Sequence, residues 1–167
     1  MTAAQTRTNR IVLGLAVLAL VVVIGAAIVV VLAIRDADER LPEITAYGNG
    51  RSITVAPAEY CTLDLRECSQ GELAVLDVNA GQPLQLSLPK EISDAPWRLV
   101  AVFEDPVSGE LVPEERYFES GATAALTVVS DREPPWQLAG VEIQLPSAVV
   151  DESGLPRAHA VWAIKTA

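Results

Sequence analysis

Few residues in this sequence could carry out chemistry. His159 is the sole histidine, Cys61 and Cys68 are the only thiols, and acidic pairs stand at Glu104-Asp105 and Glu114-Glu115. A hydrolase would need a nucleophile and an orienting acid near His159. None of Ser87, Ser108 and Ser153 lies in a Gly-x-Ser-x-Gly elbow. Paired acids serve a glycosidase only where folding sets them across a cleft. We therefore expect a protein that is not an enzyme, with a hydrolase that uses His159 or the paired acids as the alternative.

The two cysteines have two possible roles. Together with His159 and Glu67 they supply the ligand types of a zinc site, but the six residues between them exceed the two to four typical of a zinc knuckle. Two cysteines in a small domain suit a disulfide formed in an oxidising compartment. Closing a loop of about eight residues is worth roughly 2 to 3 kcal/mol. We expect a Cys61–Cys68 disulfide, with no metal and no cofactor.

The aromatic residues divide into two groups. Trp97, Phe103 and Trp162 lie within apolar strand patterns and are expected in the core. Trp136 instead follows Pro134-Pro135 in a loop, where an exposed Trp is a common contact for a sugar or a partner protein. Two interpretations of Trp136 stay open: partner contact, or a cap over the open end of the domain, which we favour.

The elements that position these residues begin with an apolar segment at 11–34. It has 24 consecutive residues without charge, Pro or polar side chain, and 17 of them are Leu, Ile or Val. A helix of this length spans about 36 Å, enough to cross a hydrocarbon core of about 30 Å with some tilt. The apolar stretch is too long for a cleaved signal peptide. We expect a single transmembrane helix.

The membrane span divides the chain into a tail at 1–10, the helix at 11–34, a stalk at 35–41 and a domain at 42–167. Arg7 and Arg10 before the span balance Arg35 and Arg40 after it, so basic residues alone do not orient the helix. The expected disulfide does, because it requires an oxidising compartment. We expect the N-terminus in the cytoplasm and the domain outside the cell membrane.

Charge limits the partners of the domain. Residues 35–167 hold all 22 acidic residues and 10 of the 12 basic ones, a formal net charge of −12. Such a surface repels nucleic acid and anionic lipid headgroups. We expect the membrane contact to be the single span only, and the partner to be an envelope protein or a cell-wall polymer.

The domain is expected to be all-β. Asn49-Gly50 predicts a type I′ hairpin over 43–56 that pairs Ile44 with Val55 and Ala46 with Ile53. Alternating or apolar runs predict further strands over 73–78, 84–88, 111–118, 122–129, 138–145 and 158–165, with 97–103 as a central strand covered on both faces. Eight or nine strands without a second helix indicate an antiparallel β-sandwich. It would be immunoglobulin-like in architecture but not a true immunoglobulin domain, because the expected disulfide is local.

Several segments carry a resemblance to a known family. They are Tyr60-Cys61 with Cys68, 82–89, 95–99, 138–146 and 159–162. In these segments the chain resembles an actinobacterial family of membrane-anchored proteins catalogued as domain of unknown function 2771. The resemblance implies an exported envelope protein of a high-GC Gram-positive bacterium, and it carries over no activity and no functional residue. The expected function is a membrane-anchored, non-catalytic module that binds an envelope protein or cell-wall polymer.

Overall fold

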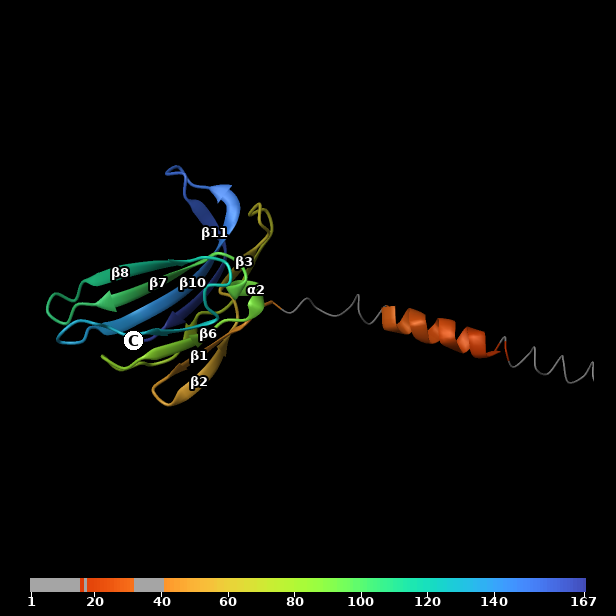
Figure 1. Cartoon of the computed structure of the whole chain (residues 1–167), viewed down its shortest axis with the longest axis horizontal. Coiled ribbons are helices and arrows are strands. Elements are labelled where there is room, and N and C mark those ends of the chain that lie inside the picture. Colours follow the sequence, from red (N-terminus) through yellow and green to blue (C-terminus); the bar gives the residue numbers. More distant parts are fainter. Residues whose placement is uncertain (1–15, 17, 32–40) are drawn as a thin grey trace, which may run out of the picture. The chain divides into compact units, whose positions relative to one another are not determined.

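The computed structural model describes residues 16, 18–31 and 41–167. Ala16 and residues 18–31 are helical and solvent-exposed (Figure 1). Of the predicted span over 11–34, residues 11–15, 17 and 32–34 lie outside the described residues, as do the tail at 1–10 and residues 35–40 of the stalk. Among the described residues, no helix has both the length and the apolar character needed to cross a membrane. Leu41–Ala167 form a unit of their own.

This unit consists mostly of two antiparallel β-sheets. The smaller sheet has four strands in the order β2-β1-β6-β9. Their bounds are Ile44–Gly48 (β1), Arg51–Val55 (β2), Leu84–Ser87 (β6) and Ala125–Val128 (β9). Every pair of neighbours in this sheet runs antiparallel.

The larger sheet has seven strands, six of them in the order β4-β3-β11-β10-β7-β8. Their bounds are Glu59–Cys61 (β3), Cys68–Gln70 (β4), Trp97–Glu104 (β7), Leu111–Phe118 (β8), Gln137–Val150 (β10) and Pro156–Lys165 (β11). The short strand β5 (Ala74–Val75) lies parallel to β11. Figure 1 shows β8, β7 and β10 in one layer and β6, β1 and β2 in the other.

The first hairpin confirms the register predicted from its turn. Ile44 pairs with Val55 and Ala46 with Ile53. Asn49 and Gly50 have φ angles of 49° and 75°, the left-handed values that a type I′ turn requires at both central positions. Ile44, Ala46 and Val55 are buried, so the predicted apolar face is the core face.

Both sheets contribute to one hydrophobic core. Buried residues alternate along the facing strands, as the two-residue period of a strand requires. The fully buried large side chains include Phe103, Leu99, Ile143 and Trp162 from the larger sheet and Ile44, Leu84, Leu86 and Val128 from the smaller. This two-layer packing is consistent with the predicted β-sandwich, and the predicted core positions of Trp97, Phe103 and Trp162 are confirmed.

Four structural expectations were wrong. β7 is buried on one face only: Trp97, Leu99, Ala101 and Phe103 point into the core, while the apolar Val100 and Val102 lie half-buried on the outer face. The described residues contain eleven strands rather than eight or nine, because several are only two to four residues long. One of these, β5, is parallel, and a four-residue helix, α2 (Lys90–Ser93), precedes β7.

The edge strand β8 accommodates a proline. Pro113 pairs with Val102 of β7, and β8 has no neighbour on its other side in the seven-stranded sheet. A proline removes one backbone donor, which an edge strand does not need on its open side. The predicted strand over 111–118 is therefore present despite its proline.

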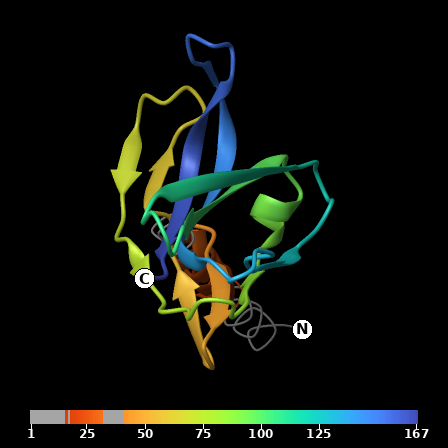
Figure 2. The same cartoon turned by 90° about the vertical axis from the view of Figure 1, so that its left-hand side faces the viewer.

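The end of β10, the beginning of β11 and the turn between them form an arm, residues 146–158. The arm lies beyond Gln144, the last residue of β10 that pairs with β7. Figures 1 and 2 show this arm projecting from the two layers, with the loop between β3 and β4 beside it. The amide of Ala148 donates a hydrogen bond of 3.0 Å to the carbonyl of Leu63 in that loop. The arm is thus attached to the segment that the two cysteines enclose.

Gly71 follows β4 at a point where two backbones meet. Its amide donates to the Ala58 carbonyl at 2.9 Å, and a Cβ at this position would lie 2.2 Å from the Pro57 carbonyl oxygen. Because backbone cannot move aside as a flexible side chain can, Gly71→Ala should lower the free energy of unfolding by about 1–3 kcal/mol. Urea denaturation of the full-length protein measures this. The neighbouring exposed residue supplies the control, Gln70→Ala, and equal midpoints for the two variants would contradict the prediction.

Candidate functional site

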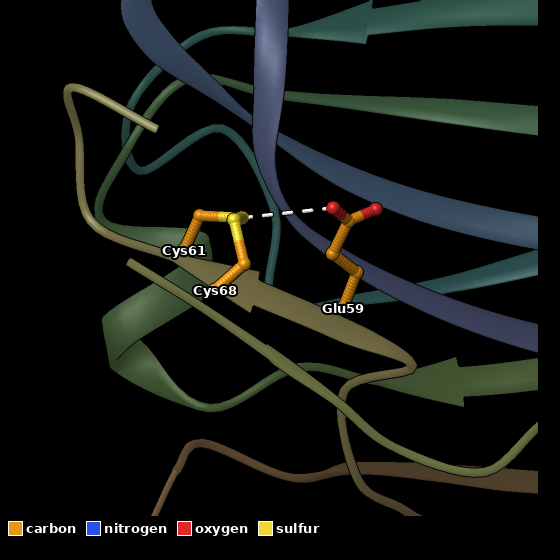
Figure 3. Close-up of side chains that lie close together, drawn as sticks. All are labelled: Glu59, Cys61 and Cys68. Atoms are coloured by element: carbon orange, nitrogen blue, oxygen red, sulfur yellow. Dashed lines mark hydrogen bonds between the residues drawn. A yellow bond between two sulfur atoms is a disulfide. The ribbon is translucent and has the colours of Figure 1, made fainter. Parts of the chain in front are cut away.

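The structure joins Cys61 and Cys68 in a disulfide, with the two residues directly opposite each other on β3 and β4 (Figure 3). The carboxylate of Glu59 approaches the Cys61 sulfur at 3.6 Å. Glu59, Cys61 and Cys68 together have the side-chain types of a metal site. However, a disulfide sulfur is neither a thiolate ligand nor a proton donor, so neither sulfur is available as a zinc ligand while the bond exists.

His159 lies half-buried on β11. Its Nδ1 atom is 3.1 Å from the carbonyl oxygen of Cys61, and its ring meets the Tyr60 ring edge-on at a centroid distance of 5.8 Å. Within residues 41–167, no hydroxyl or carboxyl side chain forms a hydrogen bond with it. The structure therefore brings His159 to the disulfide strand rather than to a nucleophile.

The acidic pairs do not face a common cleft. Glu114 and Glu115 are neighbours on β8, so their side chains point to opposite faces of the sheet. Glu114 pairs with Arg132 at 2.7 Å and Glu115 with Arg98 at 3.4 Å. Asp105 accepts hydrogen bonds from the amides of Val107 and Ser108 in a turn, and the Val107 bond lowers the pKa of its carboxyl.

Trp136 packs against the core and is half-buried. The guanidinium carbon of Arg132 lies 4.0 Å from the centre of its ring, a cation–π contact, and Arg132 also binds Glu114. The Trp136 amide donates to the Ser130 hydroxyl at 3.0 Å. Trp136 is therefore held within its own domain, with its ring in contact with Arg132.

A pocket of about 230 Å³ lies at the base of the arm. It forms because β10 and β11 continue past the first residue of β7, so that β10 has no β7 residue beside it there. Its walls are mainly apolar, and its principal residues are Trp97, Tyr117, Phe118, Pro146, Leu155 and Pro156. The Trp97 and Phe118 rings stack at 4.0 Å and form a rigid wall. We call this hollow the arm pocket.

Arg98 supplies the main polar group of the arm pocket. Its Nε donates to Gln144 Oε1 at 3.1 Å, a second nitrogen donates to the same oxygen, and Nη1 donates to Glu115 and to the Tyr117 hydroxyl at 3.4 Å. The hydrogen bond to Tyr117, with the nearby Glu115 carboxylate, raises the pKa of Arg98 against the effect of partial burial. The guanidinium therefore stays charged but is neutralised locally by Glu115.

Sequence reasoning missed the arm pocket. Gln144 and Arg98 are 46 residues apart and become neighbours only through the pairing of β7 with β10. The one signal in the sequence was Arg98 itself, a charged residue within the otherwise apolar run 97–103. The predicted site residues Cys61, Cys68 and Trp136 do not line this pocket.

The fold and the arm pocket define a class, a two-sheet, mostly antiparallel β-domain with a small apolar pocket. The model of the family described as "Protein of unknown function (DUF2771)" matches residues 37–167, so the chain belongs to that family. Uncharacterized proteins of Mycobacterium tuberculosis and Mycobacterium bovis are 36% identical to it over 141 residues, 80% of this chain and 83% of the relatives. No solved structure matches the chain.

Proposed function

We propose that this protein is a membrane-anchored, non-catalytic module of the bacterial cell envelope that holds an envelope partner at the arm pocket. The observation that supports this most strongly is the arm pocket itself, which has stacked aromatic walls and a few polar groups at one side. Concave apolar sites with few convergent polar groups are the usual form of a binding site. In this proposal the domain is an immunoglobulin-like sandwich with a local disulfide in place of one between the sheets.

The chemistry of the arm pocket favours a protein partner. Its lining includes Glu119 and Arg98, and Glu115 pairs with Arg98, so these three side chains carry a net charge of −1, within residues 35–167 of net charge −12. An apolar side chain beside a basic residue, on an extended segment of another envelope protein, would match both the walls and the rim. Charge complementarity of this kind mainly increases the association rate and the specificity.

The membrane anchor in this proposal is the segment 11–34, with the N-terminus in the cytoplasm and the domain outside. Supporting observations are its 24 uncharged apolar residues and the disulfide, which suits an oxidising compartment. A seven-residue stalk reaches at most about 25 Å. The partner would then lie in the membrane or the adjacent wall layer, where tethering raises the effective concentration toward the mM range.

The alternative, an envelope hydrolase, would use His159 or the paired acids. Neither His159 nor either acidic pair lines the arm pocket. No observation therefore favours this alternative over a binding module.

The test is site-specific photo-cross-linking in intact cells, with the photoreactive residue at the exposed position 155. The full-length protein should give an adduct in which mass spectrometry finds peptides of a second protein, and the same label at Val107, on a distant turn, should give no adduct. Glu119→Lys should reduce the adduct about tenfold, since charge steering changes association by roughly 10- to 1000-fold. Glu110→Lys, the same charge change at an exposed position of the Val107 turn, should leave the adduct unchanged.

Three outcomes would contradict the proposal. Equal adducts from Glu119→Lys and Glu110→Lys would remove the arm pocket as the docking site. An adduct that contains no second polypeptide and loses its added mass on wall digestion would identify a polymer rather than a protein. Equal capture by a secreted form that begins at residue 35 would show that the anchor is not needed.

A further inference from the structure

The outer face of the four-stranded sheet differs in composition from the rest of the domain. Eight residues point outward from β1, β2, β6 and β9, and all are exposed: Thr45, Tyr47, Ser52, Thr54, Gln85, Ser87, Ala125 and Thr127. None is charged, although residues 35–167 have a net charge of −12. We call this surface the hydroxyl face, because six of its eight side chains carry a hydroxyl group.

The strand register arranges the hydroxyl face in two parallel rows. One row runs Thr54, Thr45, Ser87 and Ala125, and the other Ser52, Tyr47, Gln85 and Thr127. Neighbouring strands lie about 4.8 Å apart, and alternate residues along a strand lie about 6.8 Å apart. The polar groups therefore repeat at regular intervals over a surface that crosses all four strands.

The polar groups of the hydroxyl face are free, unlike most hydroxyls elsewhere in the domain. Hydroxyls outside this face bond to their own chain at Thr62, Ser69, Ser108, Ser120, Thr123, Ser130, Ser147 and Thr166. Within residues 41–167, none of the eight side chains of the hydroxyl face forms a hydrogen bond with the protein. Their donors and acceptors are thus available to a ligand.

A groove of about 330 Å³ crosses this face over β1, β6 and β9. Its lining includes Tyr47, Gln85, Ser87 and Thr127. Tyr47 is 46% exposed and stands in the middle of its row, with Ser52 on one side and Gln85 on the other. It offers an aromatic surface among hydroxyl and amide groups.

This combination fits one class of partner better than two others. A protein interface generally has an apolar, aromatic-rich core, and the hydroxyl face has one aromatic residue. A polyanion needs cations, which this face lacks, and it is repelled by the acidic domain. Hydroxyl and amide groups both donate and accept, as the hydroxyls of an uncharged sugar do. An aromatic ring adds an apolar surface against which a sugar can pack.

We propose that the hydroxyl face is a binding site for an uncharged glycan strand, which lies across the four strands with one sugar against Tyr47. The site is separate from the arm pocket, whose lining it does not share. The inference therefore stands independently of the proposed docking of a protein partner.

The test uses purified full-length protein in detergent and isothermal titration with three probes: a soluble chito-oligosaccharide, a soluble α-glucan and the polyanion polygalacturonate. We expect at least one neutral glycan to bind and the polyanion not to bind. Binding of the chito-oligosaccharide alone would indicate a site for an amino-sugar strand of the wall type. Binding of both neutral glycans would indicate a site for neutral polysaccharides in general. If neither neutral glycan binds at mM concentration, or if the polyanion binds as well as they do, the inference is wrong.

Variants localise the site. Tyr47→Ala should weaken glycan binding about tenfold, because a packed ring is lost. Thr45→Val, which keeps the shape and the strand preference but removes a hydroxyl, should weaken it about three- to tenfold. Leu111→Ala removes an exposed apolar side chain from β8 of the other sheet and should leave glycan binding unchanged. Equal losses for Tyr47→Ala and Leu111→Ala, with unchanged melting curves, would place the glycan elsewhere.

Discussion

Replacing Trp162 with alanine should lower the free energy of unfolding by about 3–5 kcal/mol. Its side chain is fully buried between the two sheets, and its Nε1 donates a hydrogen bond of 2.8 Å to the carbonyl of Pro42. The substitution both opens a cavity and leaves the half-buried Pro42 carbonyl without its donor. Because domains of this kind have only about 5–15 kcal/mol of stability, much of the protein should be unfolded or degraded in cells.

Two further variants separate the parts of this effect. Trp162→Phe retains most of the packing and loses the hydrogen bond, so it should cost less than Trp162→Ala. Trp136→Ala removes a half-buried ring and should also cost less. Urea denaturation of the full-length protein, followed by circular dichroism, gives the three values. A Trp162→Ala protein as stable as Trp136→Ala would show that the core is not centred on Trp162.

Removing the disulfide should have the second largest effect. The double variant Cys61→Ser/Cys68→Ser should lose about 2–3 kcal/mol, the chain-entropy value for a loop of about eight residues. The loss should extend beyond stability, since the enclosed loop holds the arm through the Leu63–Ala148 hydrogen bond. The arm supplies Leu155 and Pro156 to the arm pocket. Photo-cross-linking at position 155 should therefore weaken in the double variant.

Alkylation of intact cells tests the disulfide in place. An impermeant maleimide should label neither cysteine before reduction and both afterwards. Wild-type protein treated with reductant should then melt at the same temperature as the double variant. Free thiols in untreated cells would contradict both the disulfide and the external orientation of the domain.

The local features of the fold were predictable from the sequence. Asn49-Gly50 selects one turn type, and that turn selects one register, so the whole first hairpin follows from two residues and an alternating pattern. Trp97, Phe103 and Trp162 occur in apolar strand patterns, and all three are buried. These inferences succeed because each depends on neighbours only a few residues away.

The remaining features depend on segments that are distant in the sequence. Nothing local in Ala74-Val75 indicates that it pairs in parallel with the last strand. The apolar Val100 and Val102 suggested a strand covered on both faces, whereas its outer face is only half-buried. The arm pocket and the hydroxyl face could not be predicted, because the first requires β10 to extend past β7 and the second requires the strand order β2-β1-β6-β9.

The hydrogen bond between Trp162 and Pro42 has a mechanical consequence. Pro42 lies just before β1, an inner strand of the smaller sheet, while Trp162 belongs to the larger sheet. A tensile force applied at Pro42 would therefore load both sheets through this bond, and not β1 alone.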